Sequence, residues 1–307
     1  MNKNSKIYVA GHTGLVGSAI VRFLQKEEYS NIVTRSSKEL NLTNQKATFE
    51  FFQTEKPEYV FLAAAKVGGI KANNDFPAEF IFQNLAMETN IINSAYLSGV
   101  QKLLFLGSSC IYPRECPQPI KEEYFMTGPL EETNKAYAVA KIAGITMCQA
   151  YNKQYGTSFI SAMPTNLYGP NDNFDLDSSH VLPALLRKFH DAKTSGAKEV
   201  VMWGTGSPMR EFLHVDDLAG ACVFLMNNYA DSEIINIGTG NDLSILELAK
   251  LIKKIVGFEG EITNDTTKPD GTPKKLLDVS KIHRLGWKHR IELNEGIRST
   301  YEWFLKD

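Results

Sequence analysis

The sequence contains no long basic run, no excess of positive charge and no apolar run long enough to cross a membrane. Its 33 Lys and Arg residues are balanced by 35 Asp and Glu residues, which gives a formal net charge of -2 at neutral pH. Because proteins that bind nucleic acids usually carry a basic patch, this balance argues against such a partner. The first residues lead directly into a predicted strand, without the apolar segment of a signal peptide. We therefore expect a cytoplasmic protein with no membrane association.

Cysteine is also scarce. The four cysteines are Cys110, Cys116, Cys148 and Cys222, and no two of them form a C-x-x-C pair. Zinc sites and redox dithiols usually show that spacing, and a disulfide scaffold requires a denser set of cysteines. The sequence therefore predicts neither a metal site nor a disulfide framework.

A glycine-rich loop follows the first predicted strand. Residues 7–10 form a short apolar strand, residues 11–17 read Gly-His-Thr-Gly-Leu-Val-Gly, and residues 18–26 have the pattern of a helix. This succession is the setting of a dinucleotide-binding fingerprint, in which the glycines let the backbone approach a pyrophosphate at the helix N-terminus. The spacing is G-x-x-G-x-x-G rather than G-x-G-x-x-G, and a glycine triple by itself is also compatible with a tight turn.

The second predicted strand, residues 31–34, is followed by Arg35, and no Asp or Glu stands at its end. An acidic residue there would bind the ribose 2′-hydroxyl of NAD, whereas an arginine suits the 2′-phosphate of NADP. Arg35 therefore favours NADP(H) as the cofactor. The alternative is that Arg35 is a solvated surface residue.

Strand and helix patterns alternate regularly only in the first part of the chain. Further patterns of buried strands occur at residues 59–65, 103–106 and 159–163. We predict an α/β fold, with a Rossmann-type doubly wound parallel sheet over residues 1–170 and a smaller α/β substrate-binding domain over residues 171–307. We expect the chain to return to the first domain at about residues 213–240.

Three side chains in the middle of the chain form a candidate site for proton transfer. Ser108 follows an apolar strand, at the end where open α/β sheets bind ligands. Tyr137 and Lys141 are four residues apart in a predicted helix and so share one face. Because a lysine beside a tyrosine favours the phenolate, we expect Tyr137 to exchange a proton near neutral pH. Either signal alone is compatible with a turn serine or a surface pair, but their order after a glycine loop indicates a site that holds a carbonyl oxygen.

With these motifs in view, the sequence resembles the extended short-chain dehydrogenase/reductase family along nearly its whole length. The most specific matching segments are residues 63–69 (AAAKVGG), 107–113 (GSSCIYP), 164–170 (PTNLYGP) and 210–217 (REFLHVDD). The resemblance implies a bifunctional enzyme that inverts C3 and C5 of GDP-4-keto-6-deoxy-D-mannose and reduces C4 with NADPH. It also implies a homodimer formed through the two long helices that start near Pro77 and Tyr137.

The resemblance further implies roles for individual residues. Ser108, Tyr137 and Lys141 match the reductase triad, and Cys110 and His180 match the base and acid of epimerisation. The implied cofactor contacts are Gly11, Thr13, Gly14, Leu15, Val16, Gly17, Arg35, Ala64, Leu106, Gly107, Tyr137, Lys141, Pro164, Asn166, Leu167 and His180. The implied GDP-sugar contacts are Ser108, Ser109, Cys110, Asn166, Lys188, Trp203, Arg210, Asp270 and Lys275. Many bacterial members carry basic residues where Thr13 stands and near Ser37, and their absence leaves Arg35 with more of the 2′-phosphate binding.

The chemistry of sugar inversion independently calls for such groups. A ketone at C4 acidifies the hydrogens at C3 and C5, and inversion needs a base on one face of the sugar and an acid on the other. Cys110 and His180 come from distant segments that could flank a sugar, although a lone cysteine more often packs as a small apolar residue. Two alternatives stay open. One is the same chemistry on a GDP-4-keto-heptose or a 3,6-dideoxyhexose, and the other is a non-catalytic NADP-binding protein.

Overall fold

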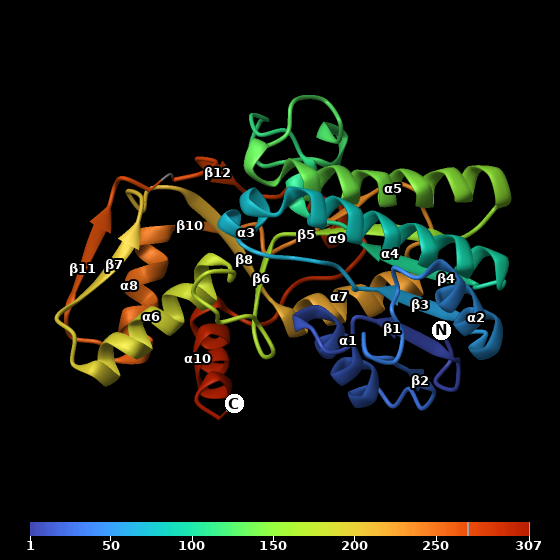
Figure 1. The fold of residues 1–307 in the computed structure, drawn as a ribbon, viewed down its shortest axis with the longest axis horizontal. Coiled ribbons are helices and arrows are strands. Elements are labelled where there is room, and N and C mark those ends of the chain that lie inside the picture. The colour runs from blue at the N-terminus through green and yellow to red at the C-terminus, as the bar shows by residue number, and fades with distance from the viewer. Residues whose placement is uncertain (269, 307) are drawn as a thin grey trace.

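In the computed structural model, which describes residues 1–268 and 270–306, the chain forms two lobes (Figure 1). The larger lobe contains the N-terminus, and its apolar core surrounds a six-stranded sheet. The smaller lobe has a separate core that includes Leu186, Phe189, Leu248 and Ile252, all fully buried. Within the described residues, no helix is long and apolar enough to cross a membrane.

The six strands of the large sheet are all parallel. In spatial order they are β2 (Ile32–Val33), β1 (Ile7–Ala10), β3 (Tyr59–Leu62), β4 (Lys102–Leu106), β5 (Phe159–Pro164) and β9 (Ile235–Ile237). The central strands are almost entirely buried, which explains their continuous apolar sequences. The winding direction reverses between β1 and β3, and such a switch point opens a crevice at the carboxyl ends of the strands.

Helices cover both faces of this sheet (Figure 1). On one face α1 (Leu15–Lys26) packs against α7 (Val215–Asn228). On the other face α4 (Pro77–Leu97) lies between α2 (Gln45–Glu55) and α5 (Lys135–Tyr155). The helices α4 and α5 are 21 residues long each and pack side by side. Side chains about 50 residues apart in sequence therefore meet on this face of the sheet.

The smaller lobe is built on short strands and three helices. In one sheet β10 (Asp242–Ser244) runs antiparallel and β12 (Lys274–Lys275) parallel to β8 (Met209–His214). A second, parallel pair joins β7 (Glu199–Trp203) to β11 (Glu261–Asp265). The helices of this lobe are α6 (Val181–Ser195), α8 (Ile245–Val256) and α10 (Leu293–Phe304). The remaining short elements are α3 (Ile70–Asp75), α9 (Ser280–Arg284) and the 3-10 turns η1 (Ser109–Ile111), η2 (Glu122–Tyr124) and η3 (Glu132–Asn134).

A buried carboxylate holds the junction between the lobes. β6 (Asn166–Tyr168) continues from β5 and pairs with the second half of β8. Glu211 on β8 is fully buried, and its carboxylate accepts the N–H groups of Thr239 at 2.6 Å, Gly240 at 2.7 Å and Leu277 at 3.0 Å. One side chain therefore ties β8 to the turn after β9 and to the segment after β12.

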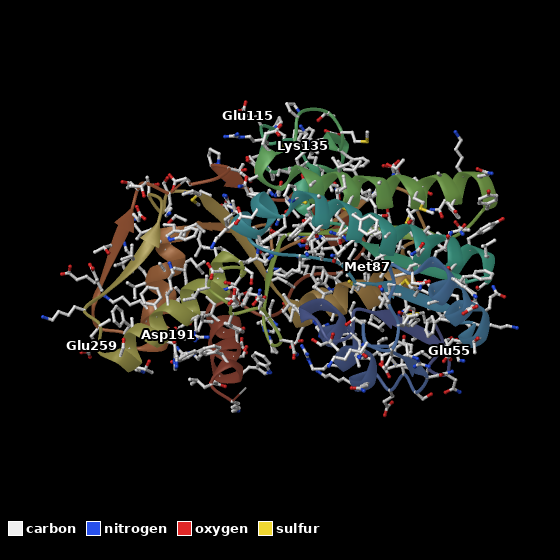
Figure 2. All side chains as sticks on the ribbon, viewed as in Figure 1. Glu55, Met87, Glu115, Lys135, Asp191 and Glu259 are labelled. Carbon is white, nitrogen blue, oxygen red and sulfur yellow. The ribbon has the colours of Figure 1, made fainter. Side chains whose placement is uncertain are left out.

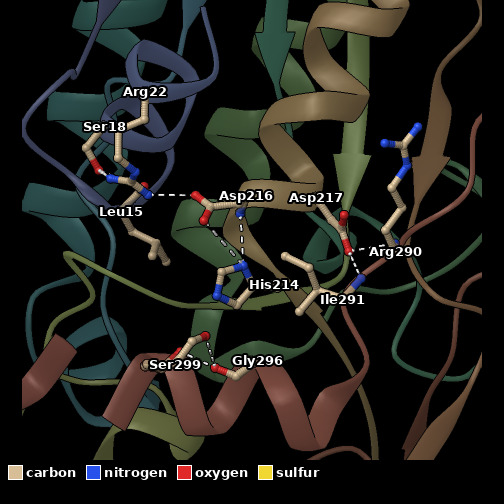
Figure 3. Close-up of polar contacts among 11 residues, drawn as sticks. Leu15, Ser18, Arg22, His214, Asp216, Asp217, Arg290, Ile291, Gly296 and Ser299 are labelled. Atoms are coloured by element: carbon tan, nitrogen blue, oxygen red, sulfur yellow. Dashed lines mark hydrogen bonds and ion pairs between the residues drawn. The ribbon is translucent and has the colours of Figure 1, made fainter. Parts of the chain in front are cut away.

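The N-terminus of α7 provides a second junction (Figure 3). Asp216 forms an ion pair with Arg22 of α1 at 2.8 Å. The neighbouring Asp217 accepts the backbone N–H groups of Arg290 and Ile291 at 2.9 and 2.8 Å. These contacts fix the glycine-loop helix and the segment before α10 to the same helix end.

The predicted fold class is confirmed, because a doubly wound parallel sheet carries a smaller mixed α/β lobe. The strand expected over residues 59–65 ends at Leu62, since residues 63–65 leave the sheet to line a cavity. The strands β6 and β11 have no counterpart among the predicted elements, because each is short and mixes polar with apolar residues. The predicted boundary at residue 170 stays a prediction.

Candidate active site

A cavity of about 610 Å³ lies along the carboxyl edge of the large sheet. Its walls come from the loops that follow β1, β3, β4 and β5 and from residues 171–180 ahead of α6. Met87, labelled in Figure 2, lines it from α4. The cavity occupies the crevice expected at the switch point between β1 and β3, and its volume falls within the range of about 300–1,000 Å³ typical of ligand sites.

The glycine loop is shaped for a group that needs close backbone approach. Gly11 has a φ of +85°, and a Cβ atom there would lie 2.8 Å from the backbone of Ala64. A Cβ atom on Gly17 would collide with the Gly11 carbonyl, so α1 can start only because residue 17 is glycine. The first turn of α1 contains no acidic residue and its N-cap, Gly14, offers no side-chain acceptor, so its N–H groups suit an anion.

The residues present therefore fit a dinucleotide. Every residue predicted to contact the cofactor lines this cavity, as do the predicted sugar contacts Ser108, Ser109 and Asn166. On the far wall, Asn84 of α4 holds the loop after β3: its amide donates to the Lys66 carbonyl at 3.0 Å and accepts from the Lys66 N–H at 2.8 Å. These two hydrogen bonds from the buried Asn84 hold residues 63–68 at the cavity wall.

Arg35 lies at one end of the cavity and is held by a carboxylate that the sequence analysis did not consider. Its Nη2 donates to Glu55 Oε1 at 2.6 Å, and its Nη1 donates to the Thr34 carbonyl at 2.8 Å. The guanidinium also lies over the Phe51 ring, 5.6 Å from the centroid. Glu55 (Figure 2) and Phe51, both on α2, therefore orient the arginine toward the end of the cavity that would hold the adenosine.

Ser108, Tyr137 and Lys141 meet at the other end of the cavity. Ser108 is the N-cap of η1, and its Oγ accepts the Cys110 N–H at 3.4 Å. Tyr137 lies in the first turns of α5, with its ring edge-on to Phe80 at a centroid distance of 6.4 Å. Lys141 Nζ lies 5.8 Å from the centroid of the Tyr137 ring. The predicted serine, tyrosine and lysine are thus brought together by the turn after β4 and by α5.

The free protein does not favour the phenolate of Tyr137, contrary to the effect expected from Lys141. Burial raises the pKa of Tyr137 well above its ordinary value, with the nearby Cys110 and Glu88 adding to the effect and a hydrogen bond with Ser108 opposing it. Lys141 does not offset this rise, because its ammonium forms an ion pair with Glu88 at 2.9 Å. Glu88 was not predicted as a site residue, although a carboxylate among the apolar positions of α4 is a sequence feature that indicates a buried partner.

His180 lines the cavity, whereas Cys110 follows the lining residues Ser108 and Ser109 and is not itself among them. Cys110 is buried in η1, and its burial raises the pKa of its thiol, while the charge of Lys275 lowers it. His180 is the N-cap of α6 and lines the cavity, toward which its side chain is open. Partial enclosure of the imidazole by the cavity walls lowers its pKa, and the charge of Lys275 lowers it further. Lys275, on β12, therefore acts electrostatically on both groups.

The other predicted GDP-sugar contacts lie on the smaller lobe, outside this cavity. Lys188 Nζ lies over the Trp203 ring, 5.5 Å from its centroid, and the indole is 51% exposed. Asp270 accepts the Thr205 N–H at 2.7 Å, and burial lowers the pKa of Arg210 while Asp270 raises it. In the structure Lys188 is therefore paired with Trp203, and Arg210 with Asp270, outside the cavity.

Residues 171–173 also line the cavity and were not predicted. Asn171 adopts a φ of +65°, and its amide donates to Ser18 Oγ of α1 at 3.2 Å. Asp172 Oδ2 is buried without a hydrogen-bond partner, and burial raises the pKa of this carboxyl to about 7. A carboxyl that is about half protonated at neutral pH places less negative charge beside a phosphate than an ordinary aspartate would. The left-handed backbone at Asn171 and its hydrogen bond to Ser18 hold this loop at α1.

The family of this chain follows from its similarity to known proteins. Residues 7–238 match the model of the NAD dependent epimerase/dehydratase family. The chain belongs to that family. GDP-L-fucose synthase 1 of Arabidopsis thaliana is 61% identical over 306 residues, which cover 100% of this chain and 95% of that protein. The resemblance to extended short-chain dehydrogenases/reductases is thereby confirmed.

Two solved structures of related proteins superpose closely on this family member. A GDP-6-OMe-4-keto-L-xylo-heptose reductase from C. jejuni has a TM-score of 0.95 at 45% identity, covering 100% of this chain and 99% of that one. A GDP-L-fucose synthetase from Naegleria fowleri bound to NADP has a TM-score of 0.92 at 34% identity, covering 100% of this chain and 95% of that one. The family name and the NADP-bound relative agree with the dinucleotide shape of the cavity.

Proposed function

We propose that the protein is a GDP-L-fucose synthase, which inverts C3 and C5 of GDP-4-keto-6-deoxy-D-mannose and reduces C4 with NADPH. The observation that carries this proposal is that Ser108, Tyr137 and His180 line one dinucleotide cavity and that Cys110 lies beside Ser108 and Tyr137. Two hydroxyl groups suit the C4 oxygen, and a thiol and an imidazole supply the base and acid that inversion needs. Full-length relatives that carry the name GDP-L-fucose synthase support the choice of sugar.

In the proposed mechanism each step uses a group that the structure brings to the site. Cys110 acts in its thiolate form and becomes a thiol as it takes the proton from C3 or C5. The Ser108 and Tyr137 hydroxyls stabilise the enolate oxygen that forms at C4. His180 returns a proton to the opposite face of the sugar. Bound NADPH supplies the hydride for C4. Tyr137 then donates its proton to the C4 oxygen, for which the raised pKa keeps it protonated.

A second candidate substrate is a GDP-4-keto-heptose, because a GDP-heptose reductase is among the closely superposing structures. Incubation of the protein with NADPH and each candidate sugar in deuterated water distinguishes the two. We expect GDP-L-fucose with deuterium at both C3 and C5, because each inversion exchanges a hydrogen with solvent. Reduction of the heptose alone, without deuterium at either carbon, would replace the proposed function by that of a simple 4-reductase.

The cofactor proposal depends on Arg35. A hydrogen bond to a charged group typically contributes about 1.5–3 kcal/mol, so Arg35→Ala should weaken NADPH binding by about 10–100-fold and leave NADH binding nearly unchanged. Dissociation constants from cofactor fluorescence provide the measurement. Arg284→Ala, which removes an exposed arginine of α9 that donates to Ser280, is the control and should change neither constant. Equal losses for NADPH and NADH in Arg35→Ala would show that Arg35 does not bind the 2′-phosphate.

We also propose that the protein forms a homodimer through α4 and α5. The supporting observation is that both helices expose apolar side chains, among them Phe82 at 67% and Leu97 at 52% on α4 and Tyr155 at 45% on α5. Such exposure on two packed helices provides a surface for a second copy. The cytoplasmic location stays a prediction.

A further inference from the structure

Glu88 lies within α4, with its carboxylate buried against α5. Its side chain is 1% exposed, that of Lys141 is 2% exposed, and Glu88 Oε1 lies 2.9 Å from Lys141 Nζ. Within the described part of the chain, no other group donates a hydrogen bond to either carboxylate oxygen. Burying a carboxylate is costly unless a cation compensates for the lost hydration. Glu88 and Lys141 therefore form one buried ionic unit at the catalytic end of the cavity.

The surrounding residues leave space for this pair. A Cβ atom on Gly144, one turn after Lys141, would collide with the Phe105 ring and lie 3.0 Å from Glu88 Oε2. The Phe105 ring also packs on the ammonium, with Lys141 Nζ 4.8 Å from its centroid. Glycine at position 144 thus lets α5 approach α4 closely enough for the ion pair, which a larger residue would separate.

The ionisable groups that act on the pair come from two elements. They are Tyr137 and Cys148 of α5 and Cys110 of η1. Lys275 of β12 acts on Cys110 and His180, whereas Lys141 is paired with Glu88. Burial contributes most to the raised pKa of Tyr137, and Cys110 and Glu88 raise it further. Glu88 is therefore the carboxylate that offsets the lysine charge next to the phenol.

We propose that Glu88 is a positioning residue that neutralises Lys141 and thereby keeps Tyr137 in its protonated, proton-donating form. This inference rests on the proposed reductase function. An unbalanced lysine beside a tyrosine favours the phenolate, which is a base suited to removing a proton from an alcohol. A lysine balanced by a buried carboxylate leaves the phenol as an acid, which is suited to protonating the oxygen of a ketone. Glu88 thus suits Tyr137 to donating a proton in the reduction of a ketone, rather than to removing one in the oxidation of an alcohol.

The test is a pH titration of Tyr137 in the free protein, followed by NMR of tyrosine labelled with carbon-13 at Cζ. The chain contains 12 tyrosines, and the signal of Tyr137 is the one lost in Tyr137→Phe. In the wild type we expect this signal to stay unchanged up to about pH 10.5, above the ordinary tyrosine pKa of about 10. In Glu88→Gln the unpaired lysine should make Tyr137 ionise at least about one pH unit earlier, so that its signal moves below pH 10.5. A Tyr137 signal that stays unchanged to the same pH in Glu88→Gln would overturn the proposal.

Three further variants separate charge from packing. Glu88→Met also removes the carboxylate and carries the same expectation if the glutamine variant does not fold. The double variant Glu88→Met/Lys141→Met removes both buried charges, and its Tyr137 should again stay protonated up to about pH 10.5, as in the wild type. Phe105→Leu changes the packing on Lys141 without changing charge and should leave the titration as in the wild type. If Phe105→Leu shifts the titration as far as Glu88→Gln, packing rather than the Glu88 charge is responsible, and the proposal fails.

A kinetic measurement links the titration to the reaction. In Glu88→Gln, the decrease of kcat at high pH should begin at least about one pH unit lower than in the wild type, because the proton donor is lost earlier. The NMR titration uses no sugar, so it does not depend on the proposed function. A shifted titration in a protein that reduces no GDP-4-keto sugar would refute the function and retain the coupling of Glu88 to Tyr137. An unshifted titration in a protein that does reduce a GDP-4-keto sugar would refute the coupling of Glu88 to Tyr137 and retain the proposed function.

Discussion

Tyr137→Phe is expected to lower the rate of ketone reduction at C4 by about 10²–10⁴-fold, the range typical of general acid catalysis. The substitution keeps the ring that packs edge-on against Phe80 and removes only the hydroxyl. Because burial holds the pKa of this phenol high, the lost group is a protonated donor at working pH. Oxidation of NADPH followed by absorbance, with the GDP-4-keto sugar at saturation, gives the rate.

A matched control is available on the same helix. Tyr151 of α5 donates a hydrogen bond to Asn93 at 2.8 Å and does not line the cavity. Tyr151→Phe therefore removes one tyrosine hydroxyl from α5 without touching the site, and its kcat should stay close to that of the wild type. Reduction by Tyr137→Phe at a rate near that of this control would mean that another group protonates the C4 oxygen.

Cys110→Ser and His180→Asn are expected to separate inversion from reduction. A hydroxyl is far less acidic than a thiol, so Cys110→Ser should exchange deuterium at C3 and C5 at least about 10²-fold more slowly. Some substrate should then be reduced before it is inverted, which yields a rhamno- or talo-configured product instead of fucose. His180→Asn leaves the base in place, so exchange should continue while completed inversion becomes rare. Product identity by NMR, measured beside the Michaelis constant, provides the test.

Cys116→Ser serves as the thiol control, because Cys116 is only partly buried and lies outside the turn η1 that carries Cys110. It should give the wild-type product. The competing view is that Cys110 only packs in η1 and that His180 only contacts phosphate. On that view both active-site variants would retain the fucose product and show a raised Michaelis constant. This outcome would refute the acid–base roles of Cys110 and His180 and leave the reductase proposal intact.

The elements that position the cofactor could be predicted from the sequence, because their signals are local. The loop from Gly11 to Gly17 needs only its own φ angles and the adjacent strand and helix to take its shape. Tyr137 and Lys141 share a face of α5 because helical periodicity places them there. The helix over residues 245–256 likewise begins at a capping box of Ser244 and Glu247, which is a local signal.

Only the tertiary structure decided how these groups are charged. Tyr137 and Lys141 suggested a phenolate, but burial of the phenol reverses that expectation, and the packing of α4 on α5 adds Glu88 against the lysine. Likewise Glu55 reaches Arg35 only because the fold brings the end of α2 beside the segment after β2, and Lys275 acts on Cys110 only because β12 pairs with β8. A pKa depends on burial and on every charge within a few ångströms, and these neighbours come from distant parts of the chain. Periodicity along the sequence therefore predicts which face a side chain occupies, whereas its protonation state depends on what the fold packs against that face.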